Sequence, residues 1–290
     1  MYPVLRLKAG RESSTGFHHP WIFSGALERA VETALHGALV HVADREGRII
    51  GTGTYSATSS IAVRLFEFGP ATIDRAWFAA RIVAADARRR LLGYGPGLPT
   101  DGYRVVFSES DGLPGLIVDR YRDVLVFQIS TAGMETLRED VLAALAEHFQ
   151  PAAMVERSDI PVRREERLEE TAGIRQGEIA GPVRFLEYGI EMVADVVEGQ
   201  KTGFFLDQKD LRQVVRGMAD GRTVLNLFAY TGASGLAAMV GGAQRVHNVD
   251  SSEVALEQCR RHAALHQIDP ERFTTERADI FQWLAAHTEP

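Results

Sequence analysis

Apolar and polar residues alternate with a period of two in several short runs near the N-terminus. The runs cover residues 4–7, 38–42, 49–53 and 61–66. Alternation of this kind is typical of strands with one buried face, and short strands at this spacing predict a small β-barrel or sandwich over residues 1–70. Between the first two runs, Trp21 and Phe23 are expected to be core residues of that barrel.

The pattern changes to a helical period from Ile73 to Leu92, and a stretch rich in glycine and proline follows at 93–99. Residues 71–97 are therefore predicted to be an amphipathic helix and a linker. Three arginines at 88–90 end this helix, where their positive charge interacts favourably with the negative end of the helix dipole. A contact between these arginines and RNA is the alternative.

The middle of the chain mixes strand and helix patterns. Apolar strand-like runs and one helical run alternate along it, at 103–107, 111–121, 124–129, 135–149 and 154–156. They predict a two-layer α+β domain over residues 98–193, with a strand or hairpin near its end at 185–192. The segment 163–170 carries both signs of charge, so we expect it to be solvated.

The C-terminal region, residues 194–290, contains a strand, loop, helix and strand unit between Thr223 and Asp250. Such a βαβ unit begins a doubly wound, Rossmann-like α/β sheet. Glycine in the loop lets a nucleoside approach the backbone, and an acidic residue at the end of the second strand can accept the ribose hydroxyls. The loop has only Gly232 and Gly235, so it favours S-adenosylmethionine, which has no phosphate, over a dinucleotide. The alternative is an ordinary turn with a solvent-facing Asp250.

A second unusual stretch, Gln200 to Gln208, lies just before this unit. It places a lysine, a threonine and an aspartate beside two adjacent phenylalanines, where a plain strand would alternate. Asp207 with Lys201 or Thr202 could match the ammonium and carboxylate groups of a methionine end. The alternative is a helix N-terminus capped by Asp207, with both phenylalanines in the core.

Composition narrows the class of protein. The 290 residues are 45% hydrophobic and 24% charged, contain no run long enough to span a membrane, and begin without the pattern of a signal peptide. We therefore expect a cytoplasmic protein without a membrane partner. The net charge of −7 argues against general binding to nucleic acid, so any RNA contact must come from a local patch. The single cysteine excludes an internal disulfide and a cysteine-rich zinc site.

Four sequence blocks carry a resemblance to a known family. They are the run from His19 to Ser24 preceded by Lys8 and Arg11, and the blocks QKTGFFLDQ, LNLFAYTG and NVDSS. Together they resemble the class I methyltransferases with an N-terminal PUA domain that make 5-methylcytosine in bacterial large-subunit rRNA. The resemblance covers the whole chain and implies a PUA-like barrel, a central α+β domain and a methyltransferase domain.

The resemblance also implies site residues. RNA would contact basic residues of the PUA-like barrel, namely Lys8, Arg11, Arg45 and Arg48. The methionine end of S-adenosylmethionine would lie around Lys201, Thr202, Phe205 and Asp207, and the glycine loop would contact the cofactor through Phe228, Tyr230 and Gly232. The ribose would lie at Asp250 and Ser251, and the adenine near Asp279.

The catalytic residues of this family have no counterpart among the 290 residues of the sequence. Members carry an Asp-Pro-Pro block and a later catalytic cysteine, whereas this sequence reaches Pro290 before either. We therefore expect a C-terminally truncated chain with an incomplete methyltransferase domain and no catalytic residue. A sheet that stops after about three strands should leave the first strand, 224–228, on an open edge, so we expect association, for instance as a homodimer.

Two other candidates for chemistry are weaker. Cys259 shares a helix face with apolar residues and is expected to be a buried small hydrophobe. His262 and His266 have a spacing that can bind metal, but without a third ligand we expect a solvated pair and no metal.

Three other functions stay open at this stage. They are a methyltransferase acting on another rRNA or tRNA base, an RNA-binding module without activity, and, least favoured, an NAD-dependent oxidoreductase.

Overall fold

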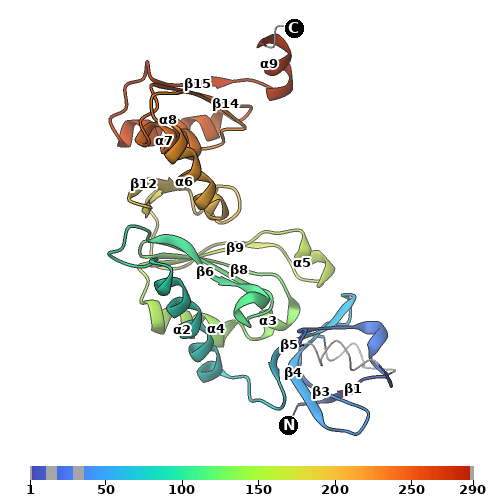
Figure 1. Cartoon of the computed structure of the whole chain (residues 1–290). Coiled ribbons are helices and arrows are strands. Elements are labelled where there is room, and N and C mark those ends of the chain that lie inside the picture. The colour runs from blue at the N-terminus through green and yellow to red at the C-terminus, as the bar shows by residue number, and fades with distance from the viewer. Residues whose placement is uncertain (1, 11–17, 29–35, 288–290) are drawn as a thin grey trace. The chain divides into compact units, whose positions relative to one another are not determined.

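The computed structural model describes residues 2–10, 18–28 and 36–287 of the chain (Figure 1). The fold divides into two compact units. Unit 1 contains residues 1–93 and 103–180, and unit 2 contains residues 94–102 and 181–290. Each unit has its own sheets and is described separately below.

The N-terminal part of unit 1 is a small β structure, as the alternating pattern predicts. Its described strands form one five-stranded sheet in the order β1-β3-β4-β5-β2. The strand bounds are β1 (Val4–Arg6), β2 (Trp21–Phe23), β3 (Leu39–Ala43), β4 (Ile49–Tyr55) and β5 (Ile61–Phe68), with a short helix η1 (Ser24–Ala26) after β2. Buried aliphatic side chains of these strands form its core.

Strand β2 contains Trp21 and Phe23, the two aromatic residues that were predicted to lie in the core of the barrel. Ile22 packs in the core, whereas the neighbouring Phe23 is 50% exposed. Trp21 is partly buried and donates its indole N–H to Glu109 over 2.8 Å. The prediction that Phe23 is a core residue is therefore wrong, because alternation along β2 turns Ile22 inward and both neighbours away.

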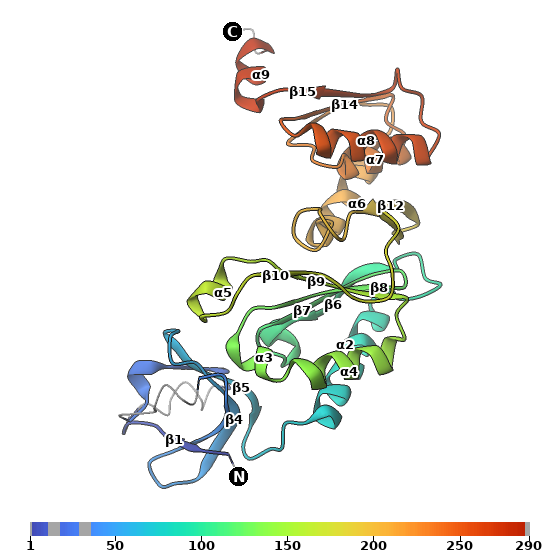
Figure 2. The ribbon, with the colours of Figure 1, turned by 180° about the vertical axis from the view of Figure 1, so that it is seen from behind.

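The rest of unit 1 is a two-layer α+β fold. Its second sheet has the order β10-β9-β8-β7-β6, and helices α2 and α4 pack against each other on one side of it (Figures 1 and 2). The elements are α2 (Arg75–Leu91), β6 (Gly102–Phe107), η3 (Ser108–Asp111), β7 (Leu116–Tyr121), β8 (Val124–Ile129), α3 (Ala132–Thr136), α4 (Arg138–Phe149), β9 (Ala153–Ser158), α5 (Val162–Glu165) and β10 (Thr171–Gln176). The helix predicted for 135–149 is thus divided into α3 and α4.

The arginines at the end of α2 bind carboxylates within unit 1. Arg88 and Arg89 both donate to Asp111, each over 2.7 Å, and Arg90 donates to Asp86 over 3.0 Å. Since Asp111 belongs to η3, these contacts attach the end of α2 to the chain that follows β6. Neither the helix dipole nor an RNA contact is needed to explain this cluster.

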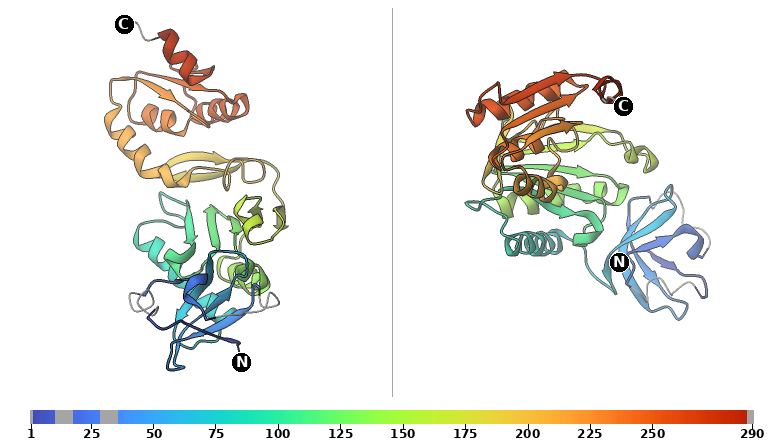
Figure 3. Two further views of the ribbon diagram at one scale, coloured as in Figure 1. Left: turned by 90° about the vertical axis from the view of Figure 1, so that its right-hand side faces the viewer. Right: turned by 45° about the horizontal axis from the view of Figure 1, so that its top comes forward.

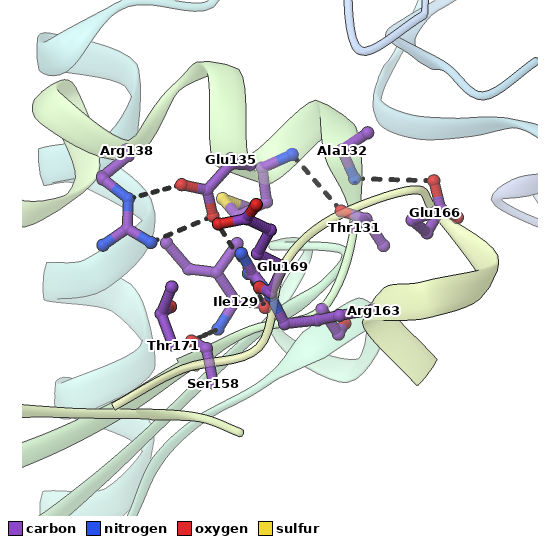
Figure 4. Close-up of polar contacts among 12 residues, drawn as sticks. Ile129, Thr131, Ala132, Glu135, Arg138, Ser158, Arg163, Glu166, Glu169 and Thr171 are labelled. Carbon is purple, nitrogen blue, oxygen red and sulfur yellow. Dashed lines mark hydrogen bonds and ion pairs between the residues drawn. The ribbon is translucent and has the colours of Figure 1, made fainter. Parts of the chain in front are cut away.

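The segment 163–170, around α5, was predicted to be solvated, but two of its charged side chains are buried. Arg163 is almost fully buried and forms an ion pair with Glu135 over 3.0 Å (Figure 4). Glu166, also buried, accepts a hydrogen bond over 2.8 Å from Ser56 of the barrel. Glu166 also forms an ion pair with Arg64 over 3.2 Å. Charged partners that are distant in sequence, Glu135 and Arg64, therefore neutralise the two buried charges, which local composition does not reveal.

Unit 2 contains the predicted βαβ unit. Its described elements are β11 (Val183–Glu187), β12 (Ile190–Ala194), η4 (Leu206–Gln208), α6 (Lys209–Met218), β13 (Thr223–Leu227), α7 (Ala233–Val240), β14 (Arg245–Asp250), α8 (Glu253–Leu265), β15 (Phe273–Arg277) and α9 (Ile280–His287). Strands β13, β14 and β15 are parallel and lie in that order, with α7 and α8 packed against them (Figure 3). The β11–β12 pair is an antiparallel hairpin.

Strand β13 lies at one edge of this sheet. Among the described residues it pairs only with β14, and its Leu225 side chain is 46% exposed. The prediction that this strand lies at an open, apolar edge is confirmed for the part of the chain that the structure describes.

Candidate functional site

The carboxyl ends of the three parallel strands bring the candidate residues to one edge of the sheet. Residues 227 and 249 are opposite each other in the β13–β14 register, and 250 is opposite 277 in the β14–β15 register. The loop after β13, the end of β14 and the start of α9 therefore lie next to one another. Ligands of doubly wound sheets bind at such an edge.

The loop after β13 has a strained backbone. Phe228 and Tyr230 have φ values of +52° and +49°, a backbone region that residues other than glycine rarely adopt. Gly232 follows at +72°, and a Cβ atom there would overlap the sulfur of Cys259. Glycine is required at this position for both reasons. Strain of this kind is typical of ligand sites, and this loop lines a pocket of about 110 Å³ together with Phe205.

Asp250 ends β14 beside this loop. Its two carboxylate oxygens accept hydrogen bonds from the backbone N–H groups of Tyr230 over 2.8 Å and of Ser252 over 2.9 Å. Each carboxylate oxygen has a further lone pair for a ligand donor. The side chain is thus held in place and still able to accept the two hydroxyl groups of a ribose.

The stretch from Gln200 to Gln208 lies next to the same loop. The Phe205 ring meets the Tyr230 ring edge to face at 5.1 Å, and the Lys201 ammonium lies 4.1 Å from the centre of the Phe205 ring. Lys201 also forms an ion pair with Asp207 over 2.9 Å. A ligand with both an ammonium and a carboxylate could exchange with this pair, so the residues fit the methionine end of S-adenosylmethionine.

The same stretch decides between the two alternatives drawn from its composition. Phe204 is buried and Phe205 is partly buried, and both line the pocket. Asp207 contacts Lys201 and lies within η4, and no side chain caps the N-terminus of η4 or of α6. The interpretation of Asp207 as a helix cap is therefore wrong, whereas one of the two phenylalanines is indeed a core residue.

Of the predicted cofactor residues, only Phe205, Phe228 and Tyr230 line this pocket; Lys201, Asp207, Gly232 and Asp250 do not, and neither do Thr202, Ser251 and Asp279. Thr202 is fully buried and does not line the pocket. Ser251 is exposed next to Asp250, and its carbonyl accepts a hydrogen bond from Arg277 over 3.2 Å. Asp279 is exposed and accepts a hydrogen bond from the backbone N–H of Gln282 in α9 over 3.0 Å.

Sequence reasoning missed Phe281 and Arg212. The Phe228 and Phe281 side chains are 63% and 75% exposed, and their rings lie 6.0 Å apart across the strand ends. Arg212 of α6 lines the pocket and is almost fully buried. The sequence did offer a signal for Phe281, because this aromatic residue directly follows Asp279 and Ile280, near which the adenine was expected. No local pattern distinguishes Arg212.

Three of the four predicted RNA-contacting residues, Lys8, Arg45 and Arg48, lie in the described part of the N-terminal barrel. Lys8 donates to the carbonyl of Gly25 over 3.0 Å, Arg45 is exposed, and Arg48 forms an ion pair with Asp44 over 2.7 Å. Arg11, the fourth, lies outside the described residues.

The weaker chemical candidates are also placed. Cys259 is fully buried, and burial raises the pKa of its thiol to about 12, as expected for an inert side chain. His262 is fully buried, and His266 is partly buried and contacts the carbonyl of Glu191 over 2.7 Å, so the prediction of a solvated pair is wrong. Among the described residues, no group of three or more histidine, cysteine, aspartate or glutamate side chains could hold a metal.

Nor is any described helix both long and apolar enough to cross a bilayer.

The fold and the sequence match together define the class. The family described as S-adenosylmethionine-dependent methyltransferase matches residues 135–285, more than half of the chain, and a PUA-like domain family matches residues 5–68. The protein is an S-adenosylmethionine-dependent methyltransferase with an N-terminal PUA-like domain, as the motifs predict.

Relatives and solved structures agree with this class. "Ribosomal RNA large subunit methyltransferase I" from Shewanella amazonensis is 42% identical over 282 residues, which are 97% of this chain and 71% of the relative. The protein of the same name from Yersinia pseudotuberculosis is 39% identical over 98% of this chain and 72% of its own length. The chain belongs to the family of these two proteins.

Two solved structures share the fold. A chain described as a SAM-dependent methyltransferase from Streptococcus mutans has a TM-score of 0.82 at 21% identity, over 98% of this chain and 73% of its own. SMU.776, described as a methyltransferase complexed with SAH, has a TM-score of 0.83 at 21% identity, over 98% of this chain and 72% of its own.

Proposed function

We propose that the protein transfers the methyl group of S-adenosylmethionine to a base of large-subunit rRNA, with 5-methylcytosine as the product. The names of its relatives support the rRNA substrate, and the motifs that resemble the 5-methylcytosine family support the product. The PUA-like domain supports an RNA substrate, because this kind of domain binds RNA.

Asp250 is the residue on which the proposed donor site depends most. It is fixed by two backbone hydrogen bonds and retains free lone pairs at the edge where such sheets bind nucleosides. Lys201 and Asp207 would bind the methionine carboxylate and ammonium, and Phe228 and Phe281 would contact the nucleoside with their exposed rings.

When bound, S-adenosylmethionine supplies a methyl group on a positively charged sulfur, ready for transfer to a nucleophilic atom. Formation of 5-methylcytosine uses a thiolate that adds to C6 of the base, so that C5 becomes the nucleophile. Cys259 is the only cysteine of the 290 residues, and a buried thiol with a pKa of about 12 does not form that thiolate. The residues of this chain therefore bind the donor and leave the role of the nucleophile unassigned.

Contacts with RNA would come from Lys8, Arg11, Arg45 and Arg48. Those that the structure describes are exposed, which suits phosphate binding. The ion pair between Arg48 and Asp44 would have to open or turn toward the phosphate, so we expect Arg45 and Lys8 to contribute more than Arg48.

Titration calorimetry with S-adenosylhomocysteine tests the donor site. The wild-type chain should bind, and Asp250→Ala should weaken binding at least tenfold, because a charge-assisted hydrogen bond to ribose is lost. Glu178→Ala, at an exposed position in unit 1, is the matched control and should bind like wild type. Equal affinity of wild type and Asp250→Ala would reject this donor site.

Mapping of modified bases tests the product. Large-subunit rRNA from a strain that lacks the gene should lose one 5-methylcytosine, and the loss should be reversed by the wild-type gene. A lost methyl group on a different base would support the methyltransferase and reject the 5-methylcytosine product. An unchanged pattern of rRNA methylation would reject rRNA as the substrate.

A further inference from the structure

The β11–β12 hairpin is connected to both loops of the candidate donor pocket through buried side chains of α6 and α8. It precedes the βαβ unit in the sequence, yet it lies in unit 2. Two side chains from other elements, Arg212 of α6 and His262 of α8, each join a hairpin residue to the carbonyl of a pocket-lining residue. No sequence motif marks either connection.

The first connection runs through Arg212. Its guanidinium donates two hydrogen bonds, over 2.6 and 2.7 Å, to the carboxylate of Glu187 in β11, and both side chains are buried. The same guanidinium donates to the carbonyl of Phe205 over 2.9 Å. Because a buried charge needs all of its hydrogen bonds, this arrangement fixes the backbone of Phe205 relative to the hairpin.

The second connection runs through His262, whose side chain is fully buried. The backbone N–H of Val193 in β12 can only donate, so Nε2 of His262, 2.8 Å away, accepts. The carbonyl of Thr231 can only accept, so Nδ1, also 2.8 Å away, carries the proton and donates. Only the neutral Nδ1–H tautomer satisfies both contacts.

The two connections hold two segments that line the same pocket. Phe205 and Thr231 both line the 110 Å³ pocket, and Thr231 also lines a second space of about 190 Å³ beside Gln258. Cys259, one turn before His262 on α8, packs directly under Gly232 of the same loop. The hairpin thus fixes the relative position of the two loops, even though neither of its strands lines the 110 Å³ pocket.

We propose that the β11–β12 hairpin is the anchor of the methyl-donor site and that His262 and Arg212 are its positioning residues. The inference rests on the proposed donor site at Asp250. It extends that site to a hairpin that the sequence analysis assigned to the central α+β domain, residues 98–193. A donor binds tightly only when both loops are held in the binding geometry, so loosening one loop should lower affinity rather than fold stability alone.

Calorimetry with S-adenosylhomocysteine on the full chain tests the proposal. His262→Phe removes both hydrogen bonds, and the dissociation constant should rise roughly tenfold. His262→Gln keeps one acceptor and one donor on its amide group, so affinity should return to within about threefold of wild type. Rescue by glutamine but not phenylalanine is not expected of a residue that merely fills space.

His266 is the matched control. It lies about one turn after His262, directly after the last residue of α8, and contacts the carbonyl of Glu191 in the same hairpin, but it lines neither of the two spaces. His266→Phe should lower the unfolding temperature and leave the affinity for S-adenosylhomocysteine within about threefold of wild type. An equal loss of affinity in both phenylalanine variants would overturn the proposal.

A spectroscopic measurement covers the case in which His262→Phe does not fold. Nitrogen-15 NMR of the histidine rings in the wild-type chain should show His262 with its proton on Nδ1 at neutral pH. A proton on Nε2, or on both nitrogens, would overturn the proposal.

The outcomes also separate this inference from the proposed donor site. No binding of S-adenosylhomocysteine by wild type would reject the site itself. Binding that is lost in Asp250→Ala and unchanged in His262→Phe would reject only the anchoring role.

Discussion

Burial of the neutral His262 makes the stability of unit 2 depend on pH. In the folded chain, burial lowers the pKa of this imidazole to about 4, from an ordinary value of 6.5. The nearby His266, which follows α8, and the Arg212 guanidinium of α6 lower this pKa further, while the hydrogen bond donated to the carbonyl of Thr231 raises it.

The sign follows from which state takes up the proton first. As pH falls through 6.5, the unfolded chain binds a proton at this histidine while the folded chain does not, so the stability that His262 contributes is lost between pH 6.5 and 4. It is fully present above pH 6.5. The difference between the two pKa values corresponds to about 3 kcal/mol in total, of which about 2 kcal/mol is lost between pH 7 and pH 5.

Urea unfolding at pH 7 and pH 5 measures this effect. The free energy of unfolding of the wild-type chain should fall by about 2 kcal/mol more than that of His262→Gln, because glutamine does not titrate. The comparison between the two chains cancels the contributions of all other titrating groups. Equal pH dependence in wild type and His262→Gln, within about 0.5 kcal/mol, would refute the reasoning.

Three further predictions concern other buried positions. Glu156→Gln should lower the free energy of unfolding of unit 1 by about 3 kcal/mol in urea titrations, because the fully buried Glu156 carboxylate loses its ion pairs with Arg138 and Arg175, and donor affinity should not change. Gly232→Ala should weaken binding of S-adenosylhomocysteine in calorimetry, and a second change, Cys259→Ala, should restore part of it by removing the overlapping sulfur. The Cys259 thiol should react with Ellman's reagent only after unfolding; rapid reaction of the native chain would contradict its burial and its pKa of about 12.

Two of the predictions that were wrong, the solvated segment 163–170 and the solvated histidine pair, share a physical cause. The segment around Arg163 and Glu166 appears solvated from its composition, and His262 looks like half of a surface pair. In the fold, Glu135 and Ser56 satisfy the first two, and Val193 and Thr231 satisfy the third. All of these partners lie 28 to 110 residues away along the chain, so no local pattern could show that the charges and the imidazole are buried.

The sequence by itself determined the local features of the donor site. Hydrophobic periodicity defined the strand, helix and strand from Thr223 to Asp250, and parallel strands necessarily bring their carboxyl ends to one edge, so Asp250 and Gly232 could be placed together without a structure. Only the tertiary structure decided what holds that site in place. The contacts of Arg212 and His262 with the β11–β12 hairpin depend on packing between elements that are remote in sequence, and hydrogen-bond partners of buried groups are fixed only when those elements meet.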